Sequence, residues 1–578
     1  RGAGTARRST AGQFQHHAAE VLFMTIAVFA FAVALTIAER ERPVWELVSA
    51  RDWAALRRPT LYSAFAGVAL MLYIWVWPPG IVLVGILGLF FLFQLSLDHV
   101  QGRSPDHIAF VGVVSMLVVA AGTAARINQP GFSATGLDFF QPTFALLVAG
   151  GCVFMAGLSR LWDSESSVSR RSYPAAIAAS AVGGFVLLAV LLPGVFDTLL
   201  NNLTGRIVPF GRSDSALTVA EVDAPEDFFG AHVSSEFGWW AFYTGVAALP
   251  VLLVQSVLNP EERAKYLLVF VWAVVLISMA MTQARFNYYL AAGVAVLNAH
   301  LVGFVTNGLS LPESVAEFDG QLSGTAALQV AVALLLVLVV FVPLLPFVAS
   351  TTPIEAGDRT LPSGDAVKWE DSNEWLANNT PAVGNYAGAG NADDIGYDDR
   401  YGYPDDGSFD YPEGAYGVLS WWDYGHLITV QGERIPHANP FQQNARSASA
   451  VLTAQNESQA ELYLDAIAAG VDVTHESNES ELRETVEASD DPPGIQYVMI
   501  DDLSAAQKFP AITQWTGPDY LDGYLAEEQR TFVRNDNRNS REVLVGDDYY
   551  DTMLARLYLE DADGLEHYRL VHESSQYS

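Results

Sequence analysis

The chain has 578 residues, 51% of them hydrophobic, and a formal net charge of −34. Its charge is unevenly distributed: residues 351–578 hold 43 acidic against 13 basic side chains, and residues 1–350 hold 22 against 18. The sequence therefore predicts an apolar block followed by an acidic one, which excludes a single soluble globule. Because a domain of net charge −30 repels phosphate, nucleic acid is excluded as a partner.

The counts of cysteine and lysine limit the kinds of site and the environment that the sequence predicts. A single cysteine, Cys152, excludes an internal disulfide framework and a cysteine-based zinc site. Only three lysines accompany 28 arginines. Acid excess with few lysines is typical of a salt-adapted protein, in which salt screens the repulsion between carboxylates. An acidic protein of an ordinary environment is the alternative. Since the first residue is arginine rather than methionine, we expect a fragment.

Runs of about 18 or more apolar residues are long enough to cross a bilayer. Ten such runs are found, at about 20–38, 60–76, 79–97, 108–126, 142–159, 174–193, 238–258, 264–283, 286–306 and 325–348. They predict a polytopic α-helical membrane domain over residues 1–349, embedded in the lipid bilayer of the cell membrane. Within it, residues 194–237 form a long polar loop. Residues 350–578 are predicted to be a separate acidic domain.

Basic residues favour one set of loops. The loops at about 39–59, 98–107, 160–173, 259–265 and 307–324 hold eleven arginines and lysines. The opposite loops hold only Arg126, Arg206, Arg212 and Arg285. Because basic residues are retained in the cytoplasm, the first set is predicted to be cytoplasmic. The N-terminal stub, the 194–237 loop and the acidic domain are then predicted to be external.

The acidic domain is predicted to be mixed α/β. Residues 350–417 are rich in turn formers and acids, which favours a mobile linker. Residues 450–470 have helical spacing, and 496–500 read as a buried strand that ends beside Asp501. The alternation over 566–572 predicts a final strand.

One pentapeptide in this domain predicts a pocket: Trp421, Trp422, Asp423, Tyr424 and Gly425. Tryptophan rings give apolar walls, indole N–H groups donate hydrogen bonds and a carboxylate accepts them. Such a site suits a small side chain with a hydroxyl group. A core tryptophan pair with an aspartate cap is the alternative.

This pentapeptide after a polytopic membrane domain resembles the catalytic subunit of archaeal oligosaccharyltransferase, of the AglB type, and the acid excess points to a haloarchaeal member. The resemblance covers nearly the whole chain. It implies that the pentapeptide binds the Ser/Thr of an Asn-X-Ser/Thr acceptor polypeptide.

A second element of the acidic domain is similar to the family's D-x-x-M-x-x-x-K-x-x-x-I motif, which completes the hydroxyl pocket. Asp501, Lys508 and Ile512 match it, and Ser504 stands in the methionine position. Their spacing predicts one helical face, although Pro510 limits the helix. An exposed ion pair between Asp501 and Lys508 is the alternative.

Two further motifs lie on the predicted external side. Thr218-Val-Ala-Glu221 resembles a short signature whose glutamate lies near a metal, and a solvated loop acid is the alternative. Arg285 resembles the arginine that contacts the phosphate of the lipid-linked oligosaccharide donor, for which a guanidinium fork is well suited. An arginine snorkelling to the interface is the alternative.

The N-terminal stub resembles the family's second acidic motif, D-x-D or D-x-H. His17 falls on its second position and is expected to bind metal, while Gln15 replaces the usual aspartate. Both are expected in extended chain before the first span. Arg8 matches the upstream arginine and is grouped with Glu221 as catalytic. Two interfacial histidines are the alternative.

The resemblance implies metal-dependent, inverting transfer of an oligosaccharide from a dolichyl phosphate-type carrier to asparagine, with Mg²⁺ or Mn²⁺ and a single subunit. It also implies that three spans and a catalytic aspartate precede Arg1, that the C-terminal domain is incomplete, and that this fragment alone is inactive. A transporter with an exported binding domain is one rival, but its spans would carry ionisable residues. A cell-surface protein with an acidic binding ectodomain is the other, and it would need one anchor rather than ten spans.

Overall fold

The protein is described from a computed structural model. The model describes residues 16–40, 44–127, 131–164, 169–208, 224–225, 227–237, 239–259, 263–308, 331, 365–398, 411–440, 442–489, 494–517, 523–525 and 545–574. These residues fall into two compact units, one up to residue 331 and one from Asp365 onward.

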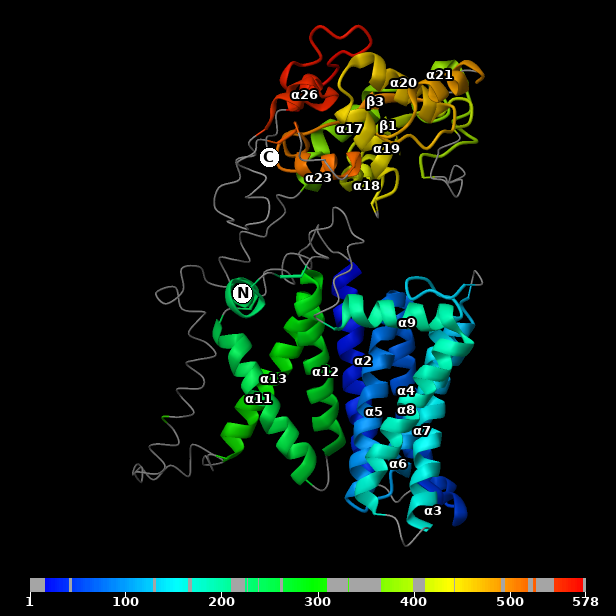
Figure 1. Ribbon diagram of the computed structural model, residues 1–578, viewed down its shortest axis with the longest axis vertical. Coiled ribbons are helices and arrows are strands. Elements are labelled where there is room, and N and C mark those ends of the chain that lie inside the picture. Colours follow the sequence, from blue (N-terminus) through cyan, green and yellow to red (C-terminus); the bar gives the residue numbers. More distant parts are fainter. Residues whose placement is uncertain are drawn as a thin grey trace. The chain divides into compact units, whose positions relative to one another are not determined.

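Long helices build the first unit (Figure 1). They are α2 His16–Glu39, α4 Trp53–Val76, α5 Val82–Val100, α6 Asp106–Ala124, α7 Phe140–Ser164, α8 Tyr173–Leu191, α9 Pro193–Arg206, α11 Trp239–Leu258, α12 Arg263–Thr282 and α13 Asn287–Gly308. Short elements join them: α3 Val44–Ser49, η1 Pro78–Ile81, η2 Arg170–Ser172, η3 Phe228–His232, α10 Val233–Glu236 and η4 Ala284–Phe286.

Nine helices among the described residues are long and apolar enough to cross a membrane. They correspond to nine of the ten predicted runs, and the tenth, 325–348, lies outside the described residues. Their outward faces are apolar: Val186, Leu187 and Val190 on α8 are all more than half exposed. Exposed apolar surface of this extent is what a lipid bilayer covers. The unit is therefore a membrane domain.

Two details differ from the sequence prediction. The helix α2 already begins at His16, so His17 is helical and the expectation of extended chain there is wrong. The helices α5 and α12 also extend into predicted loops, and their ends carry a buried ion pair between Asp98 and Arg263. This pair lies between helix ends, where each charge neutralises the other.

The second unit contains short helices and a small sheet. Its helices are α16 Asp365–Lys368, α17 Glu370–Asn379, η7 Tyr386–Gly388, η8 Trp422–Tyr424, α18 Gly425–Val430, α19 Ala445–Thr453, α20 Glu457–Ala468, α21 Glu479–Glu487, α22 Asp502–Ala505, α23 Phe509–Thr513, η9 Gln514–Thr516, α25 Asp547–Asp551 and α26 Met553–Leu559. Its strands are β1 Gly417–Leu419, β2 Ile435–Pro436 and β3 Ile495–Val498. The mixed α/β prediction is confirmed.

The sheet determines where the pocket motifs lie. Its order is β2-β1-β3 and both pairings are parallel. Gly417 pairs with Ile435 on one side and with Ile495 on the other. The chain leaves β1 toward Trp421 and leaves β3 toward Asp501, so both motifs follow the carboxyl ends of neighbouring strands. Parallel strands bring such segments together at one sheet edge.

Four local predictions for this unit are corrected. The 350–417 segment is not simply a linker, because α17 lies within it and Trp369 is buried in the core. The helix predicted over 450–470 is two helices, α19 and α20. Asp501 and Lys508 precede separate helices, α22 and α23, so Asp501 does not share the one helical face predicted for it with Lys508 and Ile512. The alternation over 566–572 forms no strand: the backbone amides of Glu566 and His567 donate to the Glu457 carboxylate instead.

A buried histidine makes the stability of this unit depend on pH. His437 follows β2, and its Nε2 lies 2.7 Å from the Ser447 hydroxyl. Burial lowers the pKa of His437 from 6.5 to about 3. Below pH 6.5 the His437 imidazole is therefore protonated in the unfolded chain but stays neutral in the folded chain. The contribution of His437 to the free energy of unfolding is fully present above pH 6.5. It is lost as the pH falls toward 3, by up to about 1.4 kcal/mol per pH unit.

We expect His437→Asn to flatten this pH dependence. The measurement is urea unfolding of the intact chain in detergent, followed by pulse proteolysis of the second unit at each pH. Wild type and variant carry the same carboxylates, so comparing their slopes isolates the histidine. The matched control is His426→Asn, at an exposed position, and it should keep the wild-type slope. An unchanged slope in His437→Asn would contradict the assignment.

Candidate functional site

The predicted acceptor pocket is formed by a tight change of backbone direction after β1. Trp421 is extended, Trp422–Tyr424 form a 3₁₀ turn, and α18 begins at Gly425. A Cβ atom at Gly425 would lie 2.1 Å from the Ala438 carbonyl oxygen, so only glycine fits there. Trp421 is 2% exposed and belongs to the core, whereas Trp422 and Asp423 are partly exposed.

Two polar groups of the pentapeptide are suited to bind a hydroxyl. The Trp422 indole N–H is buried and has no acceptor among the described residues. The next residue, Asp423, carries a partly exposed carboxylate. A hydroxyl group can accept from an indole N–H and donate to a carboxylate at once. Lys508 Nζ lies 2.8 Å from Asp423 Oδ2, so an ion pair holds the carboxylate in place.

Asp501 supports the pocket indirectly, through hydrogen bonds to neighbouring residues. Its Oδ1 accepts hydrogen bonds from the Ser504 amide and hydroxyl, at 2.8 and 2.6 Å. Its Oδ2 accepts from the Tyr424 hydroxyl at 2.7 Å and from Trp369 Nε1 at 3.3 Å. Four protein donors therefore satisfy this carboxylate, which holds Tyr424 in place. Ile512 is fully buried and contributes packing.

Tyr424 is held between two groups. The Trp369 ring stacks on it, with centroids 4.2 Å apart and planes 23° from parallel. Lys508 Nζ lies 3.9 Å from the centroid of the same ring. The indole and the ammonium cannot share one face at these distances, so they lie on opposite faces. Stacking and the cation–π contact together fix Tyr424 and, through Lys508, Asp423.

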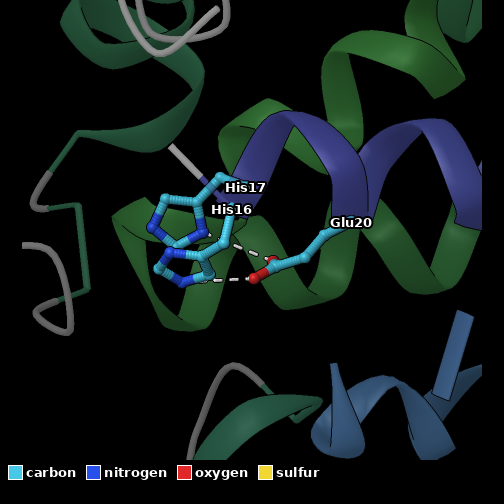
Figure 2. Close-up of side chains that lie close together, drawn as sticks. All are labelled: His16, His17 and Glu20. Carbon is cyan, nitrogen blue, oxygen red and sulfur yellow. Dashed lines mark hydrogen bonds and ion pairs between the residues drawn. The ribbon is translucent and has the colours of Figure 1, made fainter. Parts of the chain in front are cut away.

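The first unit holds a second polar cluster at the start of α2 (Figure 2). The His16 and His17 rings lie 4.0 Å apart, and the fully buried Glu20 carboxylate points at both of them. Glu20 Oε1 lies 3.3 Å from His16 Nε2, and Glu20 Oε2 lies 3.3 Å from His17 Nδ1. Spacings of three and four residues place these side chains on one helix face.

Residues of α13 complete this cluster. The Tyr288 hydroxyl lies 3.0 Å from His17 Nδ1, and the Tyr289 hydroxyl donates to Glu20. Because a carboxylate only accepts hydrogen bonds, we assign the His17 ring proton to Nδ1, which faces Glu20. The lone pair of His17 Nε2 is then available to a cation. Carboxylate support of this kind orients histidine ligands in metal sites.

These residues fit a divalent ion in part. His16, His17 and Glu20 could each offer a ligand atom, and these atoms lie within 4.8 Å of one another. Glu20 is already engaged by both histidines and Tyr289, which favours a supporting role for it. The other predicted ligands, Gln15 and Glu221, and the predicted catalytic Arg8 lie outside the described residues.

Arg285 lies between α12 and α13, in η4. Its Nε donates to Gln283 Oε1 at 2.7 Å, and its guanidinium carbon lies 5.3 Å from the Phe286 ring centroid. Tyr288, three residues later, contacts His17. The predicted phosphate-binding arginine and the predicted metal ligand therefore belong to the same end of the membrane domain.

Comparison with known proteins agrees with both halves of the chain. Residues 366–477 match the model of the AglB core domain. The chain is also 40% identical over 533 residues to the dolichyl-monophosphooligosaccharide–protein glycotransferase AglB of Haloferax volcanii, an alignment that covers 79% of this chain and 49% of the relative. Over most of its length, the chain therefore resembles the AglB oligosaccharyltransferase family.

Other members of the family resemble nearly the whole chain. The dolichyl-phosphooligosaccharide-protein glycotransferase 3 of Archaeoglobus fulgidus is 27% identical over 601 residues, 98% of this chain and 63% of the relative. A solved structure of AglB from Archaeoglobus fulgidus, in complex with an inhibitory peptide and a dolichol-phosphate, shares the fold with a TM-score of 0.75. It is 24% identical, and the match covers 98% of this chain and 63% of that one. The chain thus spans about half the length of the Haloferax relative.

At these sites the structure shows further residues that the sequence prediction missed. Glu20 is one, although its spacing from His16 was a visible signal for a shared helix face. Trp369 is another, and a lone tryptophan in an acidic, turn-rich stretch gave no signal of its place under Tyr424. Tyr288 and Tyr289 are the third case, because only the packing of α13 against α2 brings them to His17 and Glu20.

Proposed function

We propose that this chain is part of an enzyme that transfers an oligosaccharide from a dolichyl phosphate-type carrier to the asparagine of Asn-X-Ser/Thr sequences, with inversion at the sugar. The observation that carries the proposal is the arrangement of Trp422, Asp423 and Lys508 within a domain that matches the AglB core. It presents one donor and one charged acceptor to a hydroxyl group.

In this proposal the acidic domain binds the acceptor. The Ser/Thr hydroxyl donates to Asp423 and accepts from the Trp422 indole, while the ion pair with Lys508 orients the Asp423 carboxylate. These contacts select the acceptor sequence and position its asparagine. An amide nitrogen is a poor nucleophile because its lone pair is delocalised into the carbonyl, so positioning matters. Glu221 is proposed to hold the acceptor amide by hydrogen bonds, and Arg8 is proposed as a further catalytic residue.

The membrane domain is proposed to bind the donor. Arg285 binds the carrier phosphate through its guanidinium, and His17, oriented by Glu20, is a metal ligand together with Glu221. A bound Mg²⁺ or Mn²⁺ would supply positive charge to the departing phosphate. The uneven distribution of basic residues supports an external position for residues 350–578, with residues 1–349 in the cell membrane and a single subunit sufficient.

A chimera tests the proposal. The aligned region of Haloferax volcanii AglB is replaced by this chain, and membranes are assayed with labelled dolichyl-linked oligosaccharide in molar salt. We expect transfer to an Asn-X-Thr peptide but not to Gln-X-Thr, loss of transfer with a chelator, and at least tenfold slower transfer in His17→Ala, the order of magnitude expected for losing one metal ligand. A folded chimera that transfers nothing, beside an active parent enzyme, would contradict the proposal.

A further inference from the structure

Two arginines of the membrane domain, Arg206 and Arg285, lie close to each other. Arg206 ends α9, a helix that runs across the end of the long helices (Figure 1), and Arg285 follows α12. Among the described residues, neither guanidinium has a carboxylate partner: the ion pairs of this unit involve other arginines. Two unneutralised cations at one place need an explanation.

Hydrogen bonds from the end of α12 connect the chain segment of Arg206 with Arg285. The Thr282 hydroxyl donates to the Arg206 carbonyl at 2.9 Å. The Gln283 amide donates through Nε2 to the Gly205 carbonyl at 2.9 Å and accepts through Oε1 from Arg285 Nε at 2.7 Å. Gln283 is only 4% exposed. One buried amide thus bridges the chain segment of Arg206 and the guanidinium of Arg285.

This arrangement leaves the Arg206 side chain free for another partner. An arginine at a helix C-terminus often binds the last carbonyl groups of its own helix. Here side chains of α12 already bind the carbonyls of Gly205, Arg206 and Ile207. Burial, and then the neighbouring Arg285 guanidinium, lower the pKa of Arg206 from its ordinary value. Both groups stay charged at neutral pH, because a guanidinium is not deprotonated in proteins.

We propose that Arg206 and Arg285 together bind the phosphate group of a membrane lipid, so that Arg206 is a phosphate-binding residue that Arg285 alone does not replace. The inference rests on the proposed function, in which Arg285 binds the carrier phosphate. Phosphate is favoured over carboxylate because its several oxygens can accept from two guanidinium forks at once. A lipid source is favoured because Arg285 lies between the membrane-spanning helices α12 and α13, and the segment of Arg206 is bonded to the end of α12.

The site also explains why repulsion between the arginines is tolerated. Two like charges held together by Gln283 oppose each other until an anion lies between them. An anion that binds there is therefore attracted by two charges and relieves their repulsion. Arg285 precedes Tyr288, which contacts His17, so the phosphate would lie beside the proposed metal ligand.

The test uses the whole chain in phosphatidylcholine nanodiscs, titrated with dolichyl phosphate and followed by native mass spectrometry. We expect Arg206→Gln and Arg285→Gln each to weaken binding at least about tenfold, as loss of a charged hydrogen-bonding partner does. Arg206→Lys keeps the charge but loses the fork, and should fall between. The matched control is Arg126→Gln, an exposed arginine after α6 that packs over Trp75 and should bind like wild type.

Further measurements distinguish failure of this inference from failure of the proposed function. Dolichol, which lacks the phosphate, should bind weakly and equally to all variants, which excludes a general effect on folding. Wild-type binding in Arg206→Gln, with weak binding in Arg285→Gln, would overturn this inference and leave the proposed function intact. Wild-type binding in both variants would overturn both. Displacement of dolichyl phosphate by equal concentrations of inorganic phosphate would show that the site takes free phosphate rather than a lipid.

Discussion

Replacing Arg434 by methionine is expected to lower the free energy of unfolding of the second unit by at least about 3 kcal/mol. Arg434 is 2% exposed and has no carboxylate partner among the described residues. Its guanidinium donates instead to neutral oxygens: the Thr380 and Tyr416 hydroxyls and the carbonyls of Leu376, Ala377, Thr380, Gly432 and Glu433. Methionine fills the volume but donates no hydrogen bond, so each of these buried oxygens loses the donor that Arg434 supplied.

The same residue supports the acceptor pocket. The carbonyls of Leu376 and Ala377 belong to the last turn of α17, where a cation also interacts favourably with the helix dipole. Trp369, which stacks on Tyr424, is the residue that precedes α17. Loss of Arg434 therefore loosens the helix that positions Trp369.

Urea unfolding of the intact chain in detergent, at molar salt, measures the effect. Arg434→Lys should also lose at least about 2 kcal/mol, because an ammonium has three donors and cannot copy the planar fork. The exposed Arg446→Met is the matched control and should change stability by less than about 0.5 kcal/mol. A similar loss in the Arg446 control would show that charge alone, rather than the buried network, determines stability.

The sequence predicted most reliably what is encoded locally. Nine spans were found because a run of apolar residues carries its own signal. The strand predicted over 496–500 is present as β3, Ile495–Val498, although Gln496 is exposed and the strand is only partly buried. Features that depend on distant partners were missed: Asp98 and Arg263 pair across 165 residues, and Trp369 and Asp501 across 132. Neither residue of such a pair shows from its neighbours that it has a partner.

The candidate site shows the same division. The sequence showed two motifs, the pentapeptide from Trp421 to Gly425 and the aspartate after β3. It did not show that Asp423 and Asp501 have different roles. Only the fold shows that Asp501 is satisfied by four protein donors whereas Asp423 faces Lys508. The single helical face predicted for Asp501 and Lys508 was wrong because two short helices replace one. Even so, Lys508 reaches the pocket through its own helix start.

Replacing Asp423 by alanine is expected to weaken binding of an Asn-X-Thr peptide by roughly ten- to 150-fold. The change removes the carboxylate proposed to accept from the hydroxyl and leaves Lys508 beside Tyr424 without its carboxylate partner. Binding to the whole chain is measured by fluorescence anisotropy of a labelled peptide, and KM for peptide and donor is measured in the chimera. Because Asp423 acts on the acceptor alone, peptide KM should rise while donor KM stays constant.

Matched variants make this expectation specific to the pocket. Asp393→Ala removes the same charge at an exposed position and should bind peptide like wild type. Asp423→Asn keeps an oxygen acceptor but loses the charge and the ion pair with Lys508, so its affinity should lie between those of wild type and Asp423→Ala. An Asn-X-Ala peptide lacks the hydroxyl, and Asp423→Ala should not weaken its binding further. If the variant weakened the Ala and Thr peptides equally, or raised only donor KM, Asp423 would not be the group that binds the hydroxyl.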